Sequence, residues 1–387
     1  MSKRSLLATA AVAVTALLAP AMAPAQAASE INIGVITTTS GGLKSYGDSY
    51  LDGLNWGLNY YTKGKMTING KKIKLTVKDD GASIDSAQSM FKQMVGDGTK
   101  VIVGTASSTV GVALAPLAQQ NKVLYIAGPA KDPAITSPAN KYVFRSGNNS
   151  LQDFAPLVNL IKRPAGKKIV LFVEDNVFGA GNIGAVKYFM APKGATFQEI
   201  KVPSSTTDFL PFAKQAADAK GAYIFIAWSQ ALTALPMLTA LKQQGAFAKQ
   251  IPVTGLAGAA AYNLYGTIFE GTKVIMTNSY FGGVGKGAAA NQLASDFARD
   301  KKAQDLFTCT GADAARMIVQ ALTGNPDQDV DTMISNLEGF SWSGVKGLMK
   351  IDASTHVLIQ PMFLVSLRKT SAGYVPQLEK TIFNVGA

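Results

Sequence analysis

The sequence predicts an α/β protein with two doubly wound, Rossmann-like lobes, each built on a parallel sheet that helices cover on both faces. Short apolar runs rich in β-branched residues alternate with amphipathic stretches of helix length, and this alternation is typical of buried parallel sheets. The same alternation starts again after Arg145. Two successive units therefore fit a chain of 387 residues better than one very wide sheet.

The first unit is predicted from apolar residues at helical and strand spacing. Leu51, Leu54 and Leu58, for example, fall on one face of a helix. The predicted elements are, in order, strand 31–36, helix 46–61, strand 73–77, helix 84–95, strand 101–103, helix 110–118 and strand 123–127.

The second unit follows the same rules. Its predicted elements are helix 151–161, strand 168–173, helix 181–190, strand 195–202, helix 209–219, strand 222–227, helix 231–243 and strand 251–253. After 271 the order becomes less regular, with strand 272–276, helices 289–299, 310–322 and 330–337, and strand 357–367. Helices that arrive after both sheets exist indicate a chain that crosses back between the lobes. We therefore expect a multi-crossover hinge under a cleft at the carboxyl ends of the strands.

The first 27 residues are typical of a cleaved export signal. Lys3 and Arg4 precede the apolar run 6–18, and the A-x-A site 25–27 ends at Ala27. The apolar run is too short to span a bilayer, so we expect an exported protein in the periplasm or another extracytoplasmic space. Cys309 is the only cysteine, which excludes a lipidated cysteine at the cleavage site, an internal disulfide and a cysteine-based metal site.

The formal net charge of +12 raises the question of an acidic partner. The lysines are scattered, and their densest group surrounds the predicted Asn69-Gly70 turn without interleaved aromatic residues. A solvated surface explains this pattern better than a nucleic-acid interface. We expect a monomer with no nucleic-acid partner, no cofactor and no metal.

A candidate anion site follows the strand at 101–103. Gly104 ends the strand, and Ser107, Ser108 and Thr109 come directly before an apolar helix. Unpaired N–H groups and the helix dipole favour a negative group at such a helix start, and serine hydroxyls add donors. The alternative is that one serine only caps the helix.

Several motifs, in order along most of the chain, resemble the type I periplasmic binding proteins, in the Leu/Ile/Val-binding family of ABC importers. These motifs are S-G-x-x-x-x-Y-G at 40–47, N-G-K-K-I-K-L-T-V-K-D-D at 69–80, V-I-V-G-x-x-S-S at 101–108, V-L-Y-I-A-G-P-A at 123–130, Y-x-F-R at 142–145, E-D-N-x-F-G-x-G at 174–181 and T-H-x-x-x-Q-P at 355–361.

The resemblance implies the organisation of the chain. A signal peptide would cover 1–27. The first lobe would comprise 28–147 plus about 279–353, and the second lobe 148–278 plus about 354–387.

The resemblance also implies roles for single residues at the polar end of a ligand. Ser108, beside Ser107, would give its hydroxyl and N–H to a ligand carboxylate, and Ala130 would offer backbone groups. Lys131 stands where the family often has a small hydroxyl residue. Its side chain either enters the cleft and binds a carboxylate or lies solvated on the rim.

Three aromatic residues would form the apolar walls. The resemblance implies that Tyr46 and Phe178 wall the apolar side of the site from the two lobes and that Trp228 extends this wall. Trp228 ends an apolar strand, so the alternative for this side chain is ordinary core packing.

The main departure from the family pattern concerns the ligand's ammonium group. Amino-acid binders of the family carry an acidic residue after the strand at 251–253, and here that position is Leu256. An unpaired ammonium in a dry cleft costs several kcal/mol. Glu174 and Asp175 are possible substitutes, although acidic residues at such a turn often cap the next helix. We therefore expect a carboxylate with an apolar or aromatic body. A branched-chain or other apolar amino acid, or an amide, is the alternative.

These features predict a substrate-binding protein of an ABC importer, which closes on its ligand and docks on a membrane permease. An exported hydrolase is a remote alternative, because His356 is the only histidine and no nucleophile–base pair or phosphate-binding loop stands out. No catalytic residue is expected. A receptor's ligand domain would need a membrane span downstream, which the sequence printed here lacks.

Overall fold

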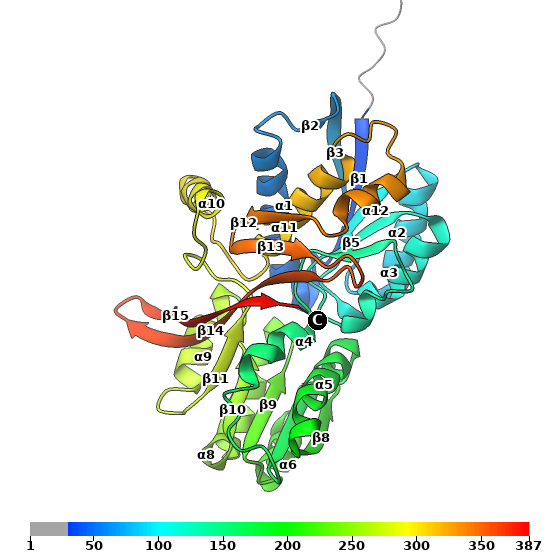
Figure 1. Cartoon of the computed structure of the whole chain (residues 1–387). Coiled ribbons are helices and arrows are strands. Elements are labelled where there is room, and N and C mark those ends of the chain that lie inside the picture. Colours follow the sequence, from blue (N-terminus) through cyan, green and yellow to red (C-terminus); the bar gives the residue numbers. More distant parts are fainter. Residues whose placement is uncertain (1–29, 387) are drawn as a thin grey trace, which may run out of the picture.

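The computed structural model describes residues 30–386 and shows two lobes joined by several chain crossings (Figure 1). The expected signal segment lies outside the described residues. Two sheets organise the chain, one of six strands and one of nine. We call the part around the six-stranded sheet the first lobe and the part around the parallel strands of the nine-stranded sheet the second lobe.

The first lobe contains a nearly all-parallel sheet. Each of its neighbouring strands pairs in parallel except β2, which is antiparallel to β3. The strand order is β2 (Thr67–Ile68), β3 (Lys71–Asp79), β1 (Glu30–Thr37), β4 (Val101–Gly104), β5 (Leu124–Ala127) and β6 (Val143–Arg145). Ile33 pairs with Val101 and both are fully buried, as expected for a parallel sheet covered on both faces.

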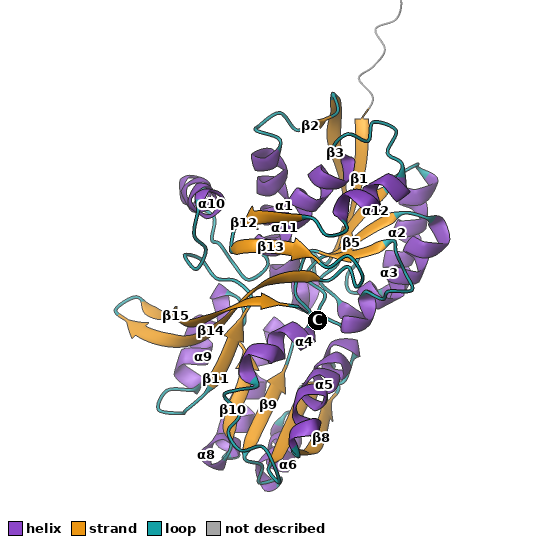
Figure 2. Cartoon of the chain, in the orientation of Figure 1, coloured by secondary structure: helices purple, strands orange, loops and turns teal. Residues whose placement is uncertain are grey.

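Helices cover this sheet, as Figure 2 shows. They are α1 (Lys44–Tyr61), α2 (Ile84–Gly96), α3 (Ser108–Asn121), α11 (Thr308–Leu322) and α12 (Val330–Leu337). Two glycines of α1 allow α11 to approach closely. A Cβ on Gly53 would lie 1.9 Å from the Thr308 oxygen, and one on Gly57 would lie 2.6 Å from the Ala315 Cβ.

The nine-stranded sheet is mixed. Its parallel strands are β7 (Lys168–Glu174), β8 (Thr196–Val202), β9 (Tyr223–Ala227), β10 (Ile251–Gly255) and β11 (Ile275–Asn278). Antiparallel strands complete it: β12 (Ser341–Gly344), β13 (Gly347–Ile351), β14 (Leu358–Thr370) and β15 (Gly373–Val385). The first two of these pack on the core of the first lobe through Trp342, Met349 and Ile351. Val170 and Phe172 pack in one core cluster, whereas Leu171 packs in another. This alternation buries both faces of the sheet.

The helices of the second lobe are α4 (Ser150–Phe154), α5 (Val177–Met190), α6 (Leu210–Asp218), α7 (Ala234–Gln243), α8 (Ala246–Lys249) and α9 (Tyr262–Ile268). The first of these is shorter than the predicted helix 151–161. It gives way to a 3-10 turn at Ala155–Leu157, because Pro156 lacks an N–H and cannot continue an α-helical ladder.

The chain crosses between the lobes three times: after β6, after β11 towards α10 (Ala288–Arg299), and between β13 and β14. The Arg145 N–H donates to the His356 oxygen at 3.2 Å, which joins the first crossing to the third. The multi-crossover hinge expected from the sequence is therefore present. Within residues 30–386, no helix is both long enough and apolar enough to cross a membrane.

Candidate functional site

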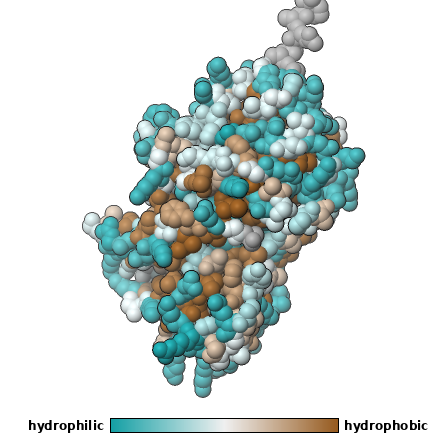
Figure 3. Space-filling model, viewed as in Figure 1, coloured by the Kyte–Doolittle hydropathy of each residue, from teal (hydrophilic) through white to brown (hydrophobic). Residues whose placement is uncertain are grey.

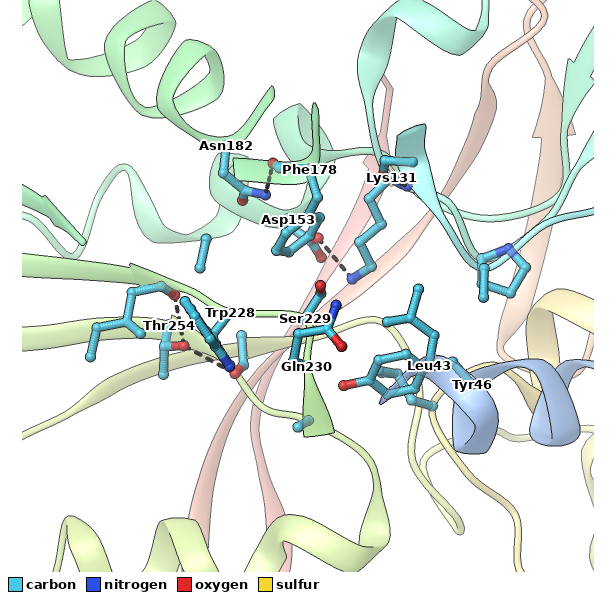
Figure 4. Close-up of a pocket in the computed structure, with 18 of the residues that line it drawn as sticks. Leu43, Tyr46, Lys131, Asp153, Phe178, Asn182, Trp228, Ser229, Gln230 and Thr254 are labelled. Atoms are coloured by element: carbon cyan, nitrogen blue, oxygen red, sulfur yellow. Dashed lines mark hydrogen bonds and ion pairs between the residues drawn. The ribbon is translucent and has the colours of Figure 1, made fainter. Parts of the chain in front are cut away.

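A pocket of about 280 Å³ lies between the lobes, where the carboxyl ends of both sets of parallel strands meet (Figure 4). This is the usual position of ligand sites in doubly wound folds. The pocket is lined by seven of the eight residues that the sequence singled out: Tyr46, Ser107, Ser108, Lys131, Phe178, Trp228 and Leu256.

The eighth residue, Ala130, does not line the pocket, although its neighbours Pro129 and Lys131 do. The Ala130 N–H donates to the Thr105 oxygen at 3.0 Å, and its oxygen accepts from Arg145 Nη1 at 2.6 Å. Both backbone groups that we expected to serve a ligand therefore already have partners within the chain.

The two serines at the start of α3 differ in their contacts. Ser107 Oγ accepts from the Val110 N–H at 3.4 Å, so this serine is the helix cap. Ser108 Oγ instead accepts from the Lys131 N–H at 3.1 Å. Among the described residues, neither the N–H groups of Ser108 and Thr109 nor the Ser108 O–H finds an acceptor. Unpaired donors therefore remain at the helix start.

Lys131 enters the pocket and forms an ion pair there (Figure 4). Its Nζ lies 2.8 Å from Asp153 Oδ2, and the two side chains are only 15% and 16% exposed. Asp153 Oδ1 also accepts from Asn148 Nδ2 at 2.7 Å. An ammonium carries three N–H donors, so Lys131 keeps donors for a second acceptor beside Phe307, whose ring centroid lies 5.7 Å away.

Aromatic rings form the apolar walls. Tyr46 meets Phe307 edge to face, with centroids 5.2 Å apart. Phe178 lines the pocket from α5. Trp228 also lines it, packs edge to face on Phe209 and donates from Nε1 to Thr233 Oγ1 at 3.0 Å. Trp228 is therefore both wall and core.

Buried phenols add to the apolar character of the pocket. Burial raises the pKa of Tyr265 to about 12, and a hydrogen bond with Thr254 partly offsets this rise. Burial, followed by the negative potential of neighbouring groups, raises the pKa of Tyr46 well above its ordinary value. Both phenols stay neutral at physiological pH.

Leu256, the residue that the resemblance matches to the acid of amino-acid binders, is apolar and buried. Leu256 is 2% exposed, and its N–H donates to the Thr277 oxygen at 2.8 Å. No carboxylate stands at this position, as the sequence indicated.

The two candidate substitutes are engaged elsewhere. The buried Glu174 carboxylate accepts from Ser204 Oγ at 2.6 Å, Ser229 N at 3.1 Å, Ser229 Oγ at 2.5 Å and Gln230 Nε2 at 3.1 Å. Asp175 is exposed, and the cap of α5 is Asn176 rather than an acidic residue. Among the residues that line the pocket, Asp153 is the only carboxylate.

The lobes touch across the rim of the pocket at two glycines. A Cβ on Gly42 would lie 2.0 Å from Gln230 Oε1 of the second lobe. A Cβ on Gly181, in α5, would lie 2.5 Å from Asp132 Oδ2 of the first lobe. The absence of side chains at these positions lets the lobes approach.

Sequence reasoning missed several lining residues, among them Asp153, Phe307, Ser229 and Gln230. Ser229 and Gln230 could have been found, because they directly follow the strand that ends before Trp228. Nothing local marks Asp153 or Phe307. Within residues 30–386, no group of three histidine, cysteine, aspartate or glutamate side chains is placed to hold a metal ion.

The fold and the pocket between two lobes define a solute-binding protein of the type I periplasmic class. A sequence profile of the family described as periplasmic binding protein matches residues 30–373. The chain belongs to this family, in its branch of branched-chain amino acid ABC transporters. It is therefore an extracytoplasmic substrate-binding component and not an enzyme.

Known relatives agree with this assignment. The chain is 27% identical over 281 residues to the Leu/Ile/Val-binding protein homolog 3 of Brucella melitensis, covering 72% of this chain and 73% of the relative. It is 28% identical to the structure of an ABC-type branched-chain amino acid transporter from Rhodopseudomonas palustris CGA009, with a TM-score of 0.75 over 92% of this chain and 97% of the other.

A third similar structure is a solute binding protein from Rhodopseudomonas palustris BisB5, solved in complex with 3,4-dihydroxy benzoic acid. It is 22% identical, with a TM-score of 0.79 over 92% of this chain and 98% of the other. This likeness shows a shared fold.

Proposed function

We propose that this protein captures a small organic carboxylate with an apolar or aromatic body by lobe closure and delivers it to a membrane permease. The observation that carries the proposal is the charge of the pocket. Its only carboxylate, Asp153, is already paired with Lys131, whereas donors at the start of α3 are unpaired. Such a site favours an anion over a cation.

The negative head of the ligand belongs at the start of α3. The N–H groups of Ser108 and Thr109, the Ser108 hydroxyl and the remaining protons of Lys131 Nζ can donate to its oxygens. A charge-assisted bond of this kind contributes about 1.5–3 kcal/mol.

The body of the ligand belongs between the rings. Tyr46, Phe178, Trp228 and Phe307 offer edges and faces of the kind that aromatic and branched aliphatic groups pack against. The benzoate-type ligand of the Rhodopseudomonas palustris BisB5 protein supports an aromatic body.

An apolar amino acid is the second candidate, and one observation favours it. Asp153 lines the pocket and could leave Lys131 to pair with a ligand ammonium. The relative from Brucella melitensis is a Leu/Ile/Val-binding protein homolog, which supports the same candidate.

The proposal includes the organisation of the chain: a signal peptide cleaved near Ala27, a first lobe of 28–147 plus about 279–353, a second lobe of 148–278 plus about 354–387, and a monomeric state. The contacts of Gly42 and Gly181 across the rim support closure of these lobes on a ligand.

A matched pair of ligands tests the proposal. The acid 4-methylpentanoate is leucine without its ammonium, and calorimetry on the mature protein compares the two beside benzoate and 4-hydroxybenzoate. We expect the acids to bind and to raise the melting temperature without being consumed. Tighter binding of leucine than of 4-methylpentanoate would overturn the anion proposal in favour of the amino-acid candidate.

A further inference from the structure

The second lobe carries a row of cations at the end of its sheet that lies away from the pocket. Strands β7 to β11 are parallel, so all of them begin at this one edge. Each segment that leads into one of these strands carries at least one exposed basic side chain. We call these residues the basic edge: Lys162, Arg163, Lys193, Lys220, Lys249 and Lys273.

The loops of the basic edge are hydrogen-bonded neighbours. The Gly166 N–H donates to the Gly194 oxygen at 2.8 Å, and the Ile251 N–H donates to the Ala222 oxygen at 3.1 Å. Neighbouring strands lie about 4.8 Å apart, so the starts of five strands span roughly 20 Å. Figure 3 shows hydrophilic atoms gathered at this end of the molecule, which lies near the labels α6 and α8 of Figure 1.

The charge of the basic edge is uncompensated. No residue of the basic edge takes part in an ion pair within the described part of the chain. The two acids near it in sequence have other partners. Asp218 pairs with Lys214 at 2.8 Å, and Glu270 pairs with Lys369 at 2.9 Å. Like charges at one surface add to a positive potential that attracts anions.

The corresponding edge of the first lobe is different, although it holds the densest lysine group in the sequence. There Lys74 pairs with Glu30 and Lys141 pairs with Asp331. Asp329 lies close by in sequence to the second of these pairs. Lys63, Lys65, Lys72 and Lys100 of the first lobe take part in no ion pair within the described residues. Unlike the basic edge, however, this surface also carries the exposed acids Asp327, Asp329 and Asp331. The first lobe therefore provides a control surface with unpaired lysines but mixed charge.

The composition of the basic edge favours a lipid surface over a protein partner. Protein interfaces have an apolar centre, whereas the exposed large hydrophobic residues of the described chain, such as Leu232 and Phe383, all lie in other segments. All residues of the basic edge but Arg163 are lysines, whose hydrated point charges on flexible stems suit a diffuse layer of phosphates.

We propose that the basic edge binds the headgroups of anionic phospholipids and holds this extracytoplasmic protein at a membrane surface. The inference does not depend on which ligand the pocket takes. Each Lys or Arg near an anionic surface strengthens partition about fivefold.

Vesicle co-sedimentation of the mature protein tests the proposal. We expect binding to phosphatidylglycerol-rich vesicles and none to phosphatidylcholine vesicles, with a steep loss as NaCl rises because salt screens surface charge. The variant Lys162→Glu/Arg163→Glu/Lys193→Glu/Lys220→Glu should bind at least tenfold more weakly. The control Lys63→Glu/Lys65→Glu/Lys72→Glu/Lys100→Glu, with the same change of net charge on the first lobe, should bind like the parent protein.

Each other outcome contradicts the proposal. An equal loss in both variants would show an effect of net charge alone, and no binding of the parent protein would leave the edge without a lipid partner. Binding to a solubilised permease that depends on these lysines, without vesicle binding, would make the edge a protein contact. Lysines near helix C-termini also stabilise helices, so the charge-reversed variant could lose stability. A second variant replaces the same four residues with Gln. Its melting temperature and its affinity for the pocket ligand show whether it is folded, and its vesicle binding then reports lipid contact alone.

Discussion

Lys131 Nζ and Asp153 Oδ2 lie 2.8 Å apart across the first chain crossing, one on the loop after β5 and the other on α4. The pair neutralises the pocket's only carboxylate while leaving protons of the ammonium available. We therefore expect this pair to set which charge a ligand carries into the pocket.

Removing the carboxylate from this pair should strengthen acid binding. In Asp153→Asn, the Lys131 charge no longer has its partner, and we expect carboxylate affinity to rise about tenfold, or 1.4 kcal/mol. Calorimetry with benzoate and 4-methylpentanoate measures the change. Unaltered affinity would place the anion away from Lys131, and a selective loss of leucine binding would instead show Asp153 to be the ammonium partner.

The two serines of α3 should respond differently to truncation. Ser108→Ala removes a pocket donor and should weaken carboxylate binding by about 1–3 kcal/mol. Ser107→Ala removes the helix cap and should lower stability by about 1 kcal/mol with a smaller effect on affinity. Calorimetry and urea unfolding on both variants separate the two roles. If Ser107→Ala weakened binding more than Ser108→Ala, Ser108 would not be the donor to the ligand carboxylate.

Lobe closure should depend on Gly181. In Gly181→Ala the new methyl group meets Asp132, so we expect weaker ligand binding and a larger radius of gyration with ligand present, measured by X-ray scattering. Gly184 is on the same helix, and a Cβ there meets nothing within 4 Å. Gly184→Ala should therefore close normally and gain up to about 1 kcal/mol of stability from helix propensity. If both variants compact alike on ligand addition, the rim contact does not limit closure.

Stability should depend on pH through Asp313, which is buried on α11. Burial raises its pKa to about 7 from 3.8, although the Lys346 charge and hydrogen bonds with Cys309 and Trp342 partly oppose the rise. The folded state then holds a proton that the unfolded state has lost, so the free energy of unfolding falls as pH rises from about 4 to about 7.

Urea unfolding at a series of pH values checks this slope, with Asp313→Asn as the comparison. We expect the free energy of unfolding of the variant to depend less on pH across that window, whatever its absolute stability.

Lys346 is buried beside the same cluster and its pKa is lowered mainly by burial. Its contribution runs the other way, because stability rises with pH up to the ordinary pKa of lysine. A steeper slope in the variant would show that Asp313 does not hold the proton.

The sequence predicted the elements with a clear apolar pattern. In these elements the side chains either alternate between core and solvent or pack into an apolar cluster on each face of the sheet. In β7, Val170 and Leu171 face different apolar clusters, and the continuous apolar run marks such a strand. Strand β15 was missed because residues such as Gln377 and Lys380 are exposed and carry no apolar period. Backbone pairing with β14, rather than a pattern of apolar side chains, makes this segment a strand.

In the pocket, too, the sequence predicted residues that a local pattern marks and missed those that depend on contacts distant in the sequence. Ser108 and Trp228 were found because they follow strand ends, where ligand sites form. Asp153 was missed because its contact with Lys131 spans 22 residues and arises only from the folded crossing. The partners of Ala130 likewise depend on Arg145, which reaches back 15 residues.

Strand β14 belongs to both halves of the molecule, since Leu358 packs in the core of the first lobe while Phe363 and Val365 pack in that of the second. If either lobe unfolded alone, the β14 side chains that pack in the other lobe would lose their support and become exposed to water. The protein should therefore unfold in one cooperative transition. A fragment that contains only one lobe would expose the apolar end of β14 and should aggregate.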